Sequence, residues 1–403
     1  MSTSPFQADG TPISLYVHIP FCETKCPYCD FNTYARIESL IPTYVEALGS
    51  EIELWGRTLG RPPVATVFFG GGTPSYLPAE DIASLMRHIG GAFDLQADAE
   101  VTLEANPGDF ASDKLSAYLG CGVNRLSIGV QSFDDRLLET LGRRHSVDDA
   151  VRSFRMALDA GFQNVSIDLM YGLPHQSLQD WERTLTETVA LAPPHISMYC
   201  LTLEEGTPMA LWAAAGRIPE PDEDLAADMY TAAERRLNEV GYRHYEISNW
   251  ALAGRESVHN LAYWKNGAYL GVGPGAHSYL AGCRFANLRS PKEYIRRMGD
   301  RLDGPLPTRL DAEALAAIPV VDSVETIDRR LEMGETMMMG LRLDAGITDG
   351  EFAERFGESA RAAFGDTVRD MVEAGLLETA DGCVKLTPRG RLLGNEVFSR
   401  FVA

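Results

Sequence analysis

The chain has 403 residues, of which 45% are hydrophobic and 23% are charged, so it is long enough for one large globular domain and one or two smaller ones. Its formal net charge of −21 repels polyphosphates, which argues against non-specific nucleic-acid binding as its main function. The N-terminus lacks the basic and apolar regions of a signal peptide, and no run approaches the roughly 18 to 20 apolar residues of a membrane span, so we expect a cytoplasmic protein.

The first half of the chain alternates short apolar runs with longer amphipathic segments. Six apolar, β-branched runs predict buried strands at residues 13–19, 64–69, 100–104, 125–130, 164–170 and 196–201. Amphipathic segments predict helices at residues 39–58, 78–92, 112–119, 134–141, 147–160 and 178–191. Strands connected by helices run parallel. We therefore expect an α/β fold, either a doubly wound sheet or a full or partial barrel.

Polar residues follow the predicted strands at the point where a parallel sheet gathers its ligands. His18 and a cysteine loop come at the end of the first strand, and residues 70–73 follow the second. Glu104, Gln131 and Asp168 end the next three. Turns attract glycine, which accounts for residues 70–73, but turn chemistry does not account for the other three side chains.

The second half of the chain divides into two further parts. After a predicted helix at 225–240, the pattern loosens through residues 242–279, which predicts an irregular elaboration of the barrel. Helices are expected at 329–341, 349–356 and 360–374, with short strands at 376–379 and 383–386, an order that resembles a winged-helix-like domain. The predicted domains are residues 1–240, 241–302 and 303–403. The acidic composition favours a packing or protein-binding role for the last one over DNA binding.

Three of the seven cysteines lie in one short loop, while the other four are scattered singly and do not form a secreted disulfide framework. Cys22, Cys26 and Cys29 have the spacing C-x3-C-x2-C. Thiolates at this spacing bind zinc or an iron–sulfur cluster. A zinc site needs a fourth ligand, for which His18 is available. A four-iron cluster held by three cysteines leaves one iron open to a small molecule.

The segment from Tyr16 to Cys29, with the sequence YVHIPFC-x3-C-x2-C, resembles the radical S-adenosylmethionine (SAM) enzymes of the coproporphyrinogen dehydrogenase-like branch. The resemblance implies a partial (β/α)6 TIM-like radical SAM barrel with an elaborated extension and a small winged-helix-like C-terminal domain. It also implies a [4Fe-4S] cluster on the three cysteines, with the amino and carboxylate groups of SAM on the open iron.

The resemblance continues beyond the cysteine loop. Residues 70–74, GGGTP, look like the glycine-rich SAM segment of the family, whereas a phosphate loop would need a lysine that is missing. By resemblance, the SAM contacts are Tyr16, Gly71, Gly72, Thr73, Glu104, Gln131, Arg143 and Asp168. Carboxylates suit the ribose hydroxyls and the sulfonium charge of SAM, and an arginine suits its carboxylate.

Residues 259–264, HNLAYW, resemble the H-N-x-x-Y-W motif of the HemW-type haem chaperones in this branch. The resemblance implies that His259, Tyr263 and Trp264 bind haem, because an imidazole can ligate the iron and aromatic faces can stack on the macrocycle. A hydrogen-bonded core histidine is the alternative. His277 is a second candidate ligand. The methionines at 337–339 predict core packing instead of haem ligation.

Two features separate the chaperone from the dehydrogenase. The dehydrogenase has a further cysteine where this chain has Phe31, and a longer segment before the cluster than residues 1–12 provide. The resemblance therefore implies a chaperone without an assigned catalytic residue, which delivers haem to apo haem proteins, expected to be respiratory. A homodimer and membrane association through the recipients are further expectations. Oxygen-independent coproporphyrinogen III dehydrogenation and a zinc-stabilised interaction module are the alternatives.

Overall fold

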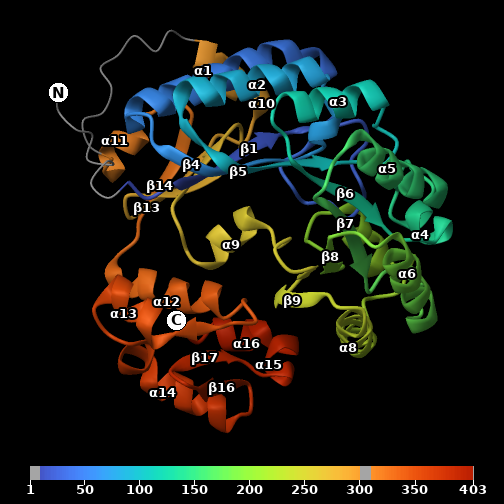
Figure 1. The fold of residues 1–403 in the computed structure, drawn as a ribbon, viewed down its shortest axis with the longest axis vertical. Coiled ribbons are helices and arrows are strands. Elements are labelled where there is room, and N and C mark those ends of the chain that lie inside the picture. Colours follow the sequence, from blue (N-terminus) through green and yellow to red (C-terminus); the bar gives the residue numbers. More distant parts are fainter. Residues whose placement is uncertain (1–9, 300–309, 403) are drawn as a thin grey trace.

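A 12-stranded sheet forms the framework of the part of the chain that the computed structural model describes, residues 10–299 and 310–402. Its centre holds six parallel strands in chain order: β1 (Ile13–Ile19), β4 (Pro63–Gly71), β5 (Asp94–Ala105), β6 (Arg125–Gln131), β7 (Val165–Tyr171) and β8 (His195–Cys200). The sheet curls into a partial barrel (Figure 1). The six predicted strands and the α/β fold are thus confirmed, with β5 longer than expected.

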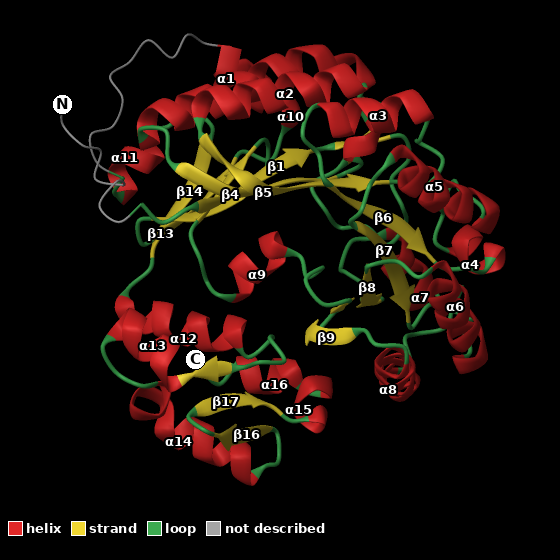
Figure 2. Ribbon diagram, in the orientation of Figure 1, coloured by secondary structure: helices red, strands yellow, loops and turns green. Residues whose placement is uncertain are grey.

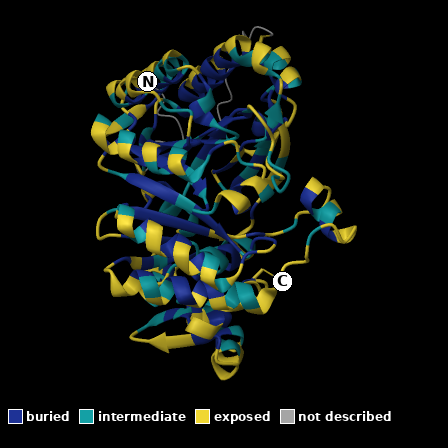
Figure 3. Cartoon of the chain, turned by 90° about the vertical axis from the view of Figure 1, so that its right-hand side faces the viewer, coloured by how far each residue is buried: buried dark blue, intermediate teal, exposed yellow. Residues whose placement is uncertain are grey.

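Helices cover the outer side of these strands (Figure 2). They are α1 (Ile41–Leu59), α2 (Ala79–Ala92), α3 (Ser112–Gly120), α4 (Asp135–Thr140), α5 (Val147–Ala160), α6 (Leu178–Leu191), α7 (Pro208–Ala214) and α8 (Glu223–Glu239). Along the helices exposed residues alternate with buried ones, whereas most strand residues are buried (Figure 3). No helix within the described residues combines the length and the apolar character needed to cross a lipid bilayer.

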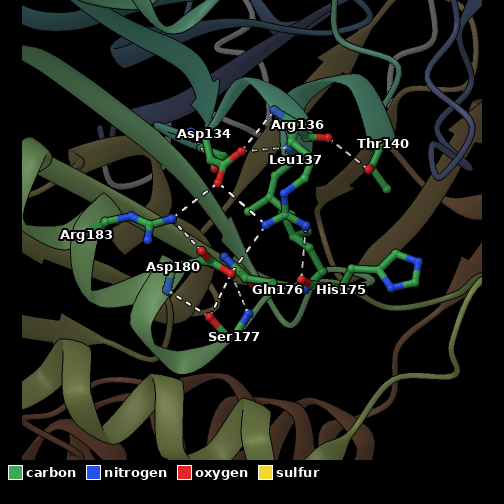
Figure 4. Close-up of polar contacts among 11 residues, drawn as sticks. Asp134, Arg136, Leu137, Thr140, His175, Gln176, Ser177, Asp180 and Arg183 are labelled. Carbon is green, nitrogen blue, oxygen red and sulfur yellow. Dashed lines mark hydrogen bonds and ion pairs between the residues drawn. The ribbon is translucent and has the colours of Figure 1, made fainter.

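A polar network joins α4 and α6, the helices that follow β6 and β7 (Figure 4). Ser177 and Asp180 form a capping box at the start of α6, and the Asp134 carboxylate caps α4. Arg136 lies 3.6 Å from Asp134 and 3.4 Å from Asp180, and Arg183 contacts the same two carboxylates. Single surface ion pairs stabilise a fold little, but this network fixes two helix starts relative to each other.

Short strands extend the sheet beyond the barrel at both edges. Strands β10 (Asn249–Ala251) and β9 (Arg243–Glu246) add antiparallel to β8. At the other edge, β11 (Tyr269–Val272) pairs parallel with β1, followed by β12 (His277–Leu280), β13 (Cys283–Asn287) and β14 (Val321–Thr326). The expected elaboration of the barrel over 242–279 is present, but it contains regular short strands in place of the irregular structure that we expected. Strands of three to five residues are too short to show an alternating pattern in the sequence. The predicted boundary between residues 302 and 303 lies outside the described residues.

A buried carboxylate fastens this extension to the barrel. Glu51 of α1 is 0% exposed. It accepts hydrogen bonds from Gly273 N (2.7 Å), Asn287 Nδ2 (2.7 Å), Trp55 Nε1 (3.3 Å) and the Tyr294 hydroxyl of α10 (Pro291–Gly299). A buried carboxylate is tolerated only when such donors surround it. Residues 241–299 are therefore packed as part of the barrel.

The C-terminal part has a hydrophobic core of its own, from Met333 to Phe401. It contains α12 (Arg329–Gly340), β15 (Ile347–Thr348), α13 (Asp349–Phe356), α14 (Ala360–Glu373), β16 (Leu377–Ala380), β17 (Cys383–Leu386), α15 (Pro388–Leu392) and α16 (Gly394–Phe398). Its three strands pair in the order β15-β17-β16. This is the winged-helix-like domain expected from the sequence, and Met337, which is 0% exposed, packs in its core.

Helix α9 (Val258–Trp264) lies between the barrel and the C-terminal domain (Figures 1 and 2). The guanidinium of Arg342 lies 5.0 Å from the ring centre of Trp264 and 4.9 Å from that of Phe398. Arg284 of β13 bonds to Glu335 of α12 at 2.7 Å. These cation–π and ionic contacts attach the C-terminal domain to α9 and to the extended sheet.

Candidate functional site

A cavity of about 530 Å³ opens at the carboxyl ends of the parallel strands. Its walls come from the loop after β1, the glycine segment after β4 and the ends of β5 to β8. The predicted cluster and SAM residues that line it are Cys22, Cys26, Cys29, Gly71, Gly72, Thr73, Glu104, Gln131, Arg143 and Asp168. A second hollow, of about 680 Å³ between α1 and α2, contains none of the predicted residues.

The three clustered cysteines are free thiols on one wall of this cavity. A two-residue pairing between β2 (Phe21–Cys22) and β3 (Tyr34–Ala35) closes their loop. Polar side chains approach all three sulfurs: Thr73 Oγ1 lies 3.6 Å from Cys22 Sγ, Arg143 Nη1 3.7 Å from Cys26 Sγ, and Thr33 Oγ1 3.8 Å from Cys29 Sγ. Burial raises the pKa of the Cys22 and Cys29 thiols, so iron binding would displace their protons.

The arrangement of the sulfurs suits a cluster better than a single ion. No three His, Cys, Asp or Glu side chains in the described ranges converge closely enough to share one metal ion. Both ring nitrogens of His18 are already engaged, with the Tyr16 hydroxyl and the Asn32 carbonyl, each at 3.0 Å. A zinc ion with His18 as the fourth ligand therefore does not fit, whereas in a cubane each cysteine binds a different iron.

The glycine segment forms a cradle that side chains would fill. Gly71 has φ +110°, a conformation that favours glycine, and a methyl group there would lie 2.4 Å from the His18 ring. A methyl group on Gly72 would lie 2.7 Å from the Phe21 carbonyl and 3.1 Å from Cys22 Sγ. The backbone of this segment therefore borders the cysteines without side chains between them.

Two half-buried carboxylates form the inner wall. Glu104 Oε2 accepts a hydrogen bond from Gly71 N at 3.1 Å. Asp168 accepts from the hydroxyls of Ser127, at 2.8 and 2.9 Å, and Ser166, at 2.8 Å. Burial and the nearby Asp168 charge raise the pKa of Glu104 to about 7, and burial also raises the pKa of Asp168. A cationic ligand such as a sulfonium would favour the charged form of both.

Two predicted contacts at the mouth are held in constrained positions. Arg143 donates from Nη2 to the Gly129 carbonyl at 2.8 Å and to the Asn106 side chain. Its buried Nε has no hydrogen-bond partner among the described residues, which leaves this donor for a ligand. Gln131 has φ +68°, at a register shift between β6 and β7, and strain of this kind is common at binding sites.

Arg125 is a cavity residue that the sequence prediction missed. Its side chain is 2% exposed and its Nε lies 3.9 Å from Glu100 Oε2. That Nε has no hydrogen bond within the described structure. Little in the sequence indicates this position, because Arg125 is the first residue of an apolar strand. A single arginine beside a run of apolar residues is the only signal there.

Tyr16 and His259 do not line this cavity. Tyr16 stacks on Phe68, which does line it, at 6.2 Å between ring centres. His259 is 1% exposed, and its Nδ1 and Nε2 lie 2.8 Å from Thr66 Oγ1 and 3.0 Å from the Tyr263 hydroxyl. Burial lowers the pKa of His259 to about 3. Both ring nitrogens of His259 therefore have hydrogen-bond partners in this structure, as a histidine of the protein core would.

The other two aromatics of the motif also pack within the protein. Tyr263 makes an edge contact with Tyr269, at 4.7 Å between ring centres, and Trp264 lies against Arg342. Of this motif, Asn260 lines the cavity. The motif thus connects β4, α9 and the C-terminal domain, and none of its predicted haem contacts lines the cavity.

Comparison with known proteins places these features in a family. The model of the radical SAM superfamily matches residues 16–187, and that of the HemN C-terminal domain matches residues 327–393. The heme chaperone HemW of Bacillus subtilis is 40% identical over 96% of this chain and 99% of its own. The heme chaperone HemW of Haemophilus influenzae is 34% identical over 97% of this chain and 98% of its own.

A solved structure supports the same fold. Coproporphyrinogen III oxidase (HemN) from Escherichia coli superposes with a TM-score of 0.81 at 23% identity, covering 97% of this chain and 90% of that one. At this identity the likeness concerns the fold alone. It includes the extended sheet and the C-terminal domain, since both lie within the matched length.

Proposed function

Because this chain belongs to the HemW family of radical SAM proteins, we propose that it is a haem chaperone, which binds haem and passes it to apo haem proteins. The observation that carries the proposal is similarity to heme chaperones along almost the whole chain, 96% of it for the B. subtilis protein. Respiratory haem proteins are the recipients we propose.

We propose that Cys22, Cys26 and Cys29 hold a [4Fe-4S] cluster, since they are free and lie on one cavity wall. SAM would occupy the rest of the cavity. The glycine segment would take its methionine end, and the two inner carboxylates, Glu104 and Asp168, would bind its ribose and offset its sulfonium charge. When bound, the cluster would supply one electron at a time and an open iron for the amino acid part of SAM.

The dehydrogenase alternative has less support. Phe31, two residues after Cys29, stands where that enzyme has a further cysteine, and its side chain is 65% exposed. The likeness to the E. coli oxidase, at 23% identity, extends to the fold and not to the reaction. We therefore propose that haem is carried and released unchanged.

The proposal is tested on protein reconstituted anaerobically with iron and sulfide. We expect one haem per chain in a titration followed by absorbance, and transfer of this haem to apomyoglobin as a probe acceptor. With SAM, a reductant and coproporphyrinogen III, we expect no protoporphyrinogen. A protein that decarboxylates coproporphyrinogen, or that binds no haem, would contradict the proposal.

We further propose that the protein works in the cytoplasm, forms a homodimer and approaches membranes only through its recipients. Sedimentation of the protein with and without its cluster tests the dimer. A single monomer mass in both states at micromolar concentration would exclude it.

A further inference from the structure

A haem chaperone needs a side chain that binds the haem iron, and His259 has no free nitrogen for it. We infer that His277 supplies the imidazole for the iron, with Arg284 and Arg289 beside it for the haem propionates. This inference rests on the proposed function. His277 is the first residue of β12, which lies between β11 and β13 in the part of the sheet beyond β1, and it is exposed.

The exposure of His277 follows from its neighbours in the sheet. Across the strands, its partner on β13 is Ala286, and the pairing of Tyr269 with Tyr279 places Gly271 opposite it on β11. A methyl group on Gly271 would lie 2.1 Å from the His277 carbonyl, so this neighbour has no room for a side chain. With a glycine and an alanine beside it, the imidazole is left uncovered.

The ring of His277 has no hydrogen bond to any other residue in the described ranges, in contrast to His18, His195 and His259, whose ring nitrogens are bonded on both sides. Partial burial and the charges of Arg284 and Arg289 lower the pKa of His277. The ring is therefore neutral at physiological pH, which is the form that ligates iron.

The two arginines provide the charge that haem requires. Haem carries two propionate groups, and guanidinium groups bind carboxylates through paired hydrogen bonds. Arg284 already bonds to Glu335 at 2.7 Å and lies 3.4 Å from Glu325. Arg289 forms no ion pair with another described residue. We therefore expect Arg289 to contribute more to propionate binding than Arg284.

The site adjoins the cysteine loop. Asn32, three residues after Cys29, donates from Nδ2 to the carbonyls of Pro274 and Arg289, both at 2.9 Å. Phe31 precedes it with an exposed aromatic ring. Haem on His277 would thus lie beside the loop that holds the cluster, with Phe31 as an apolar surface on that loop.

The test compares three histidines in cluster-loaded protein titrated with ferric haem. We expect His277→Ala to weaken haem binding at least tenfold and to shift the Soret band. His259→Ala should keep the wild-type spectrum. The matched control is His175→Asn, since His175 is exposed with its ring turned away from the polar network (Figure 4), and asparagine tolerates its φ of +63°.

A second variant guards against a loss of folding. His277→Met should still bind haem, but with the absorption and electron paramagnetic resonance spectra of a thioether-ligated iron. Wild-type affinity and spectra in both His277 variants would overturn the inference. If the wild-type protein itself bound no haem, the proposed function would fail instead, so the two failures are distinguishable.

Discussion

Replacement of Glu104 by glutamine is expected to stabilise the cluster-free protein at pH 8 and to have little effect at pH 5. Burial and the Asp168 charge raise the pKa of Glu104 from 4.5 to about 7 in the folded state. A raised pKa means that the folded state binds the proton of Glu104 more tightly than the unfolded state does. The stabilisation from this bound proton is therefore fully present below pH 4.5 and is lost as the pH rises through 7. Glutamine removes this dependence.

The size of the effect follows from the gap between the two pKa values. A gap from 4.5 to about 7 corresponds to about 3 kcal/mol above pH 8. Because Glu104 lines an open cavity and water reaches it, we expect about 2 kcal/mol in practice. The assay is urea unfolding of wild type and Glu104→Gln at pH 5 and pH 8.

The control for this prediction is Glu204→Gln, an exposed carboxyl on the rim of the same cavity, which should change stability little at either pH. If Glu104→Gln destabilised the protein equally at both pH values, the hydrogen bond from Gly71 would outweigh the cost of burial, and the reasoning would be refuted.

Three further predictions concern the cluster, the cradle and the domain contact. Cys26→Ser should abolish the cluster absorbance and lower bound iron and sulfide by at least tenfold after anaerobic reconstitution; an unchanged iron content would exclude this ligand. Gly72→Ala should weaken SAM binding at least tenfold in calorimetry, with an unchanged circular dichroism spectrum, because its methyl group would lie 3.1 Å from Cys22 Sγ. Arg342→Ala should lower the free energy of unfolding by about 1–2 kcal/mol, since the variant loses the cation–π contacts with Trp264 and Phe398. Arg342→Lys keeps the positive charge and should therefore retain part of this stabilisation. An equal loss of stability in both variants would show that packing, and not the cation–π contacts, is responsible.

The barrel and the cavity could be predicted because their signals are local. Long apolar runs marked the six strands, and the cysteine spacing marked the loop at the end of β1. Parallel strands then bring residues far apart in sequence, such as Cys22 and Asp168, to one end of the sheet without further information.

The sequence could not show the surroundings of residues that contact distant parts of the chain. His259 is held by Thr66, which lies 193 positions away in the chain, so the motif alone could not show that its ring is occupied. Arg125 looked like an ordinary strand residue. The strands of the extension pair with backbone groups that β1 and β8 leave free at the two edges of the six-stranded sheet. Which strands become edge strands depends on the assembled sheet and cannot be predicted from the sequence of the extension alone.

The carboxylate of Glu51 has a consequence for how the molecule unfolds. It comes from the first helix of the barrel, while three of its four hydrogen-bond donors come from residues 273–294. A fragment that stopped at residue 240 would leave this buried carboxyl group with only the Trp55 donor of its four. Melting of the barrel and of its added strands should therefore occur in one cooperative transition, and proteolysis should release no stable six-stranded core.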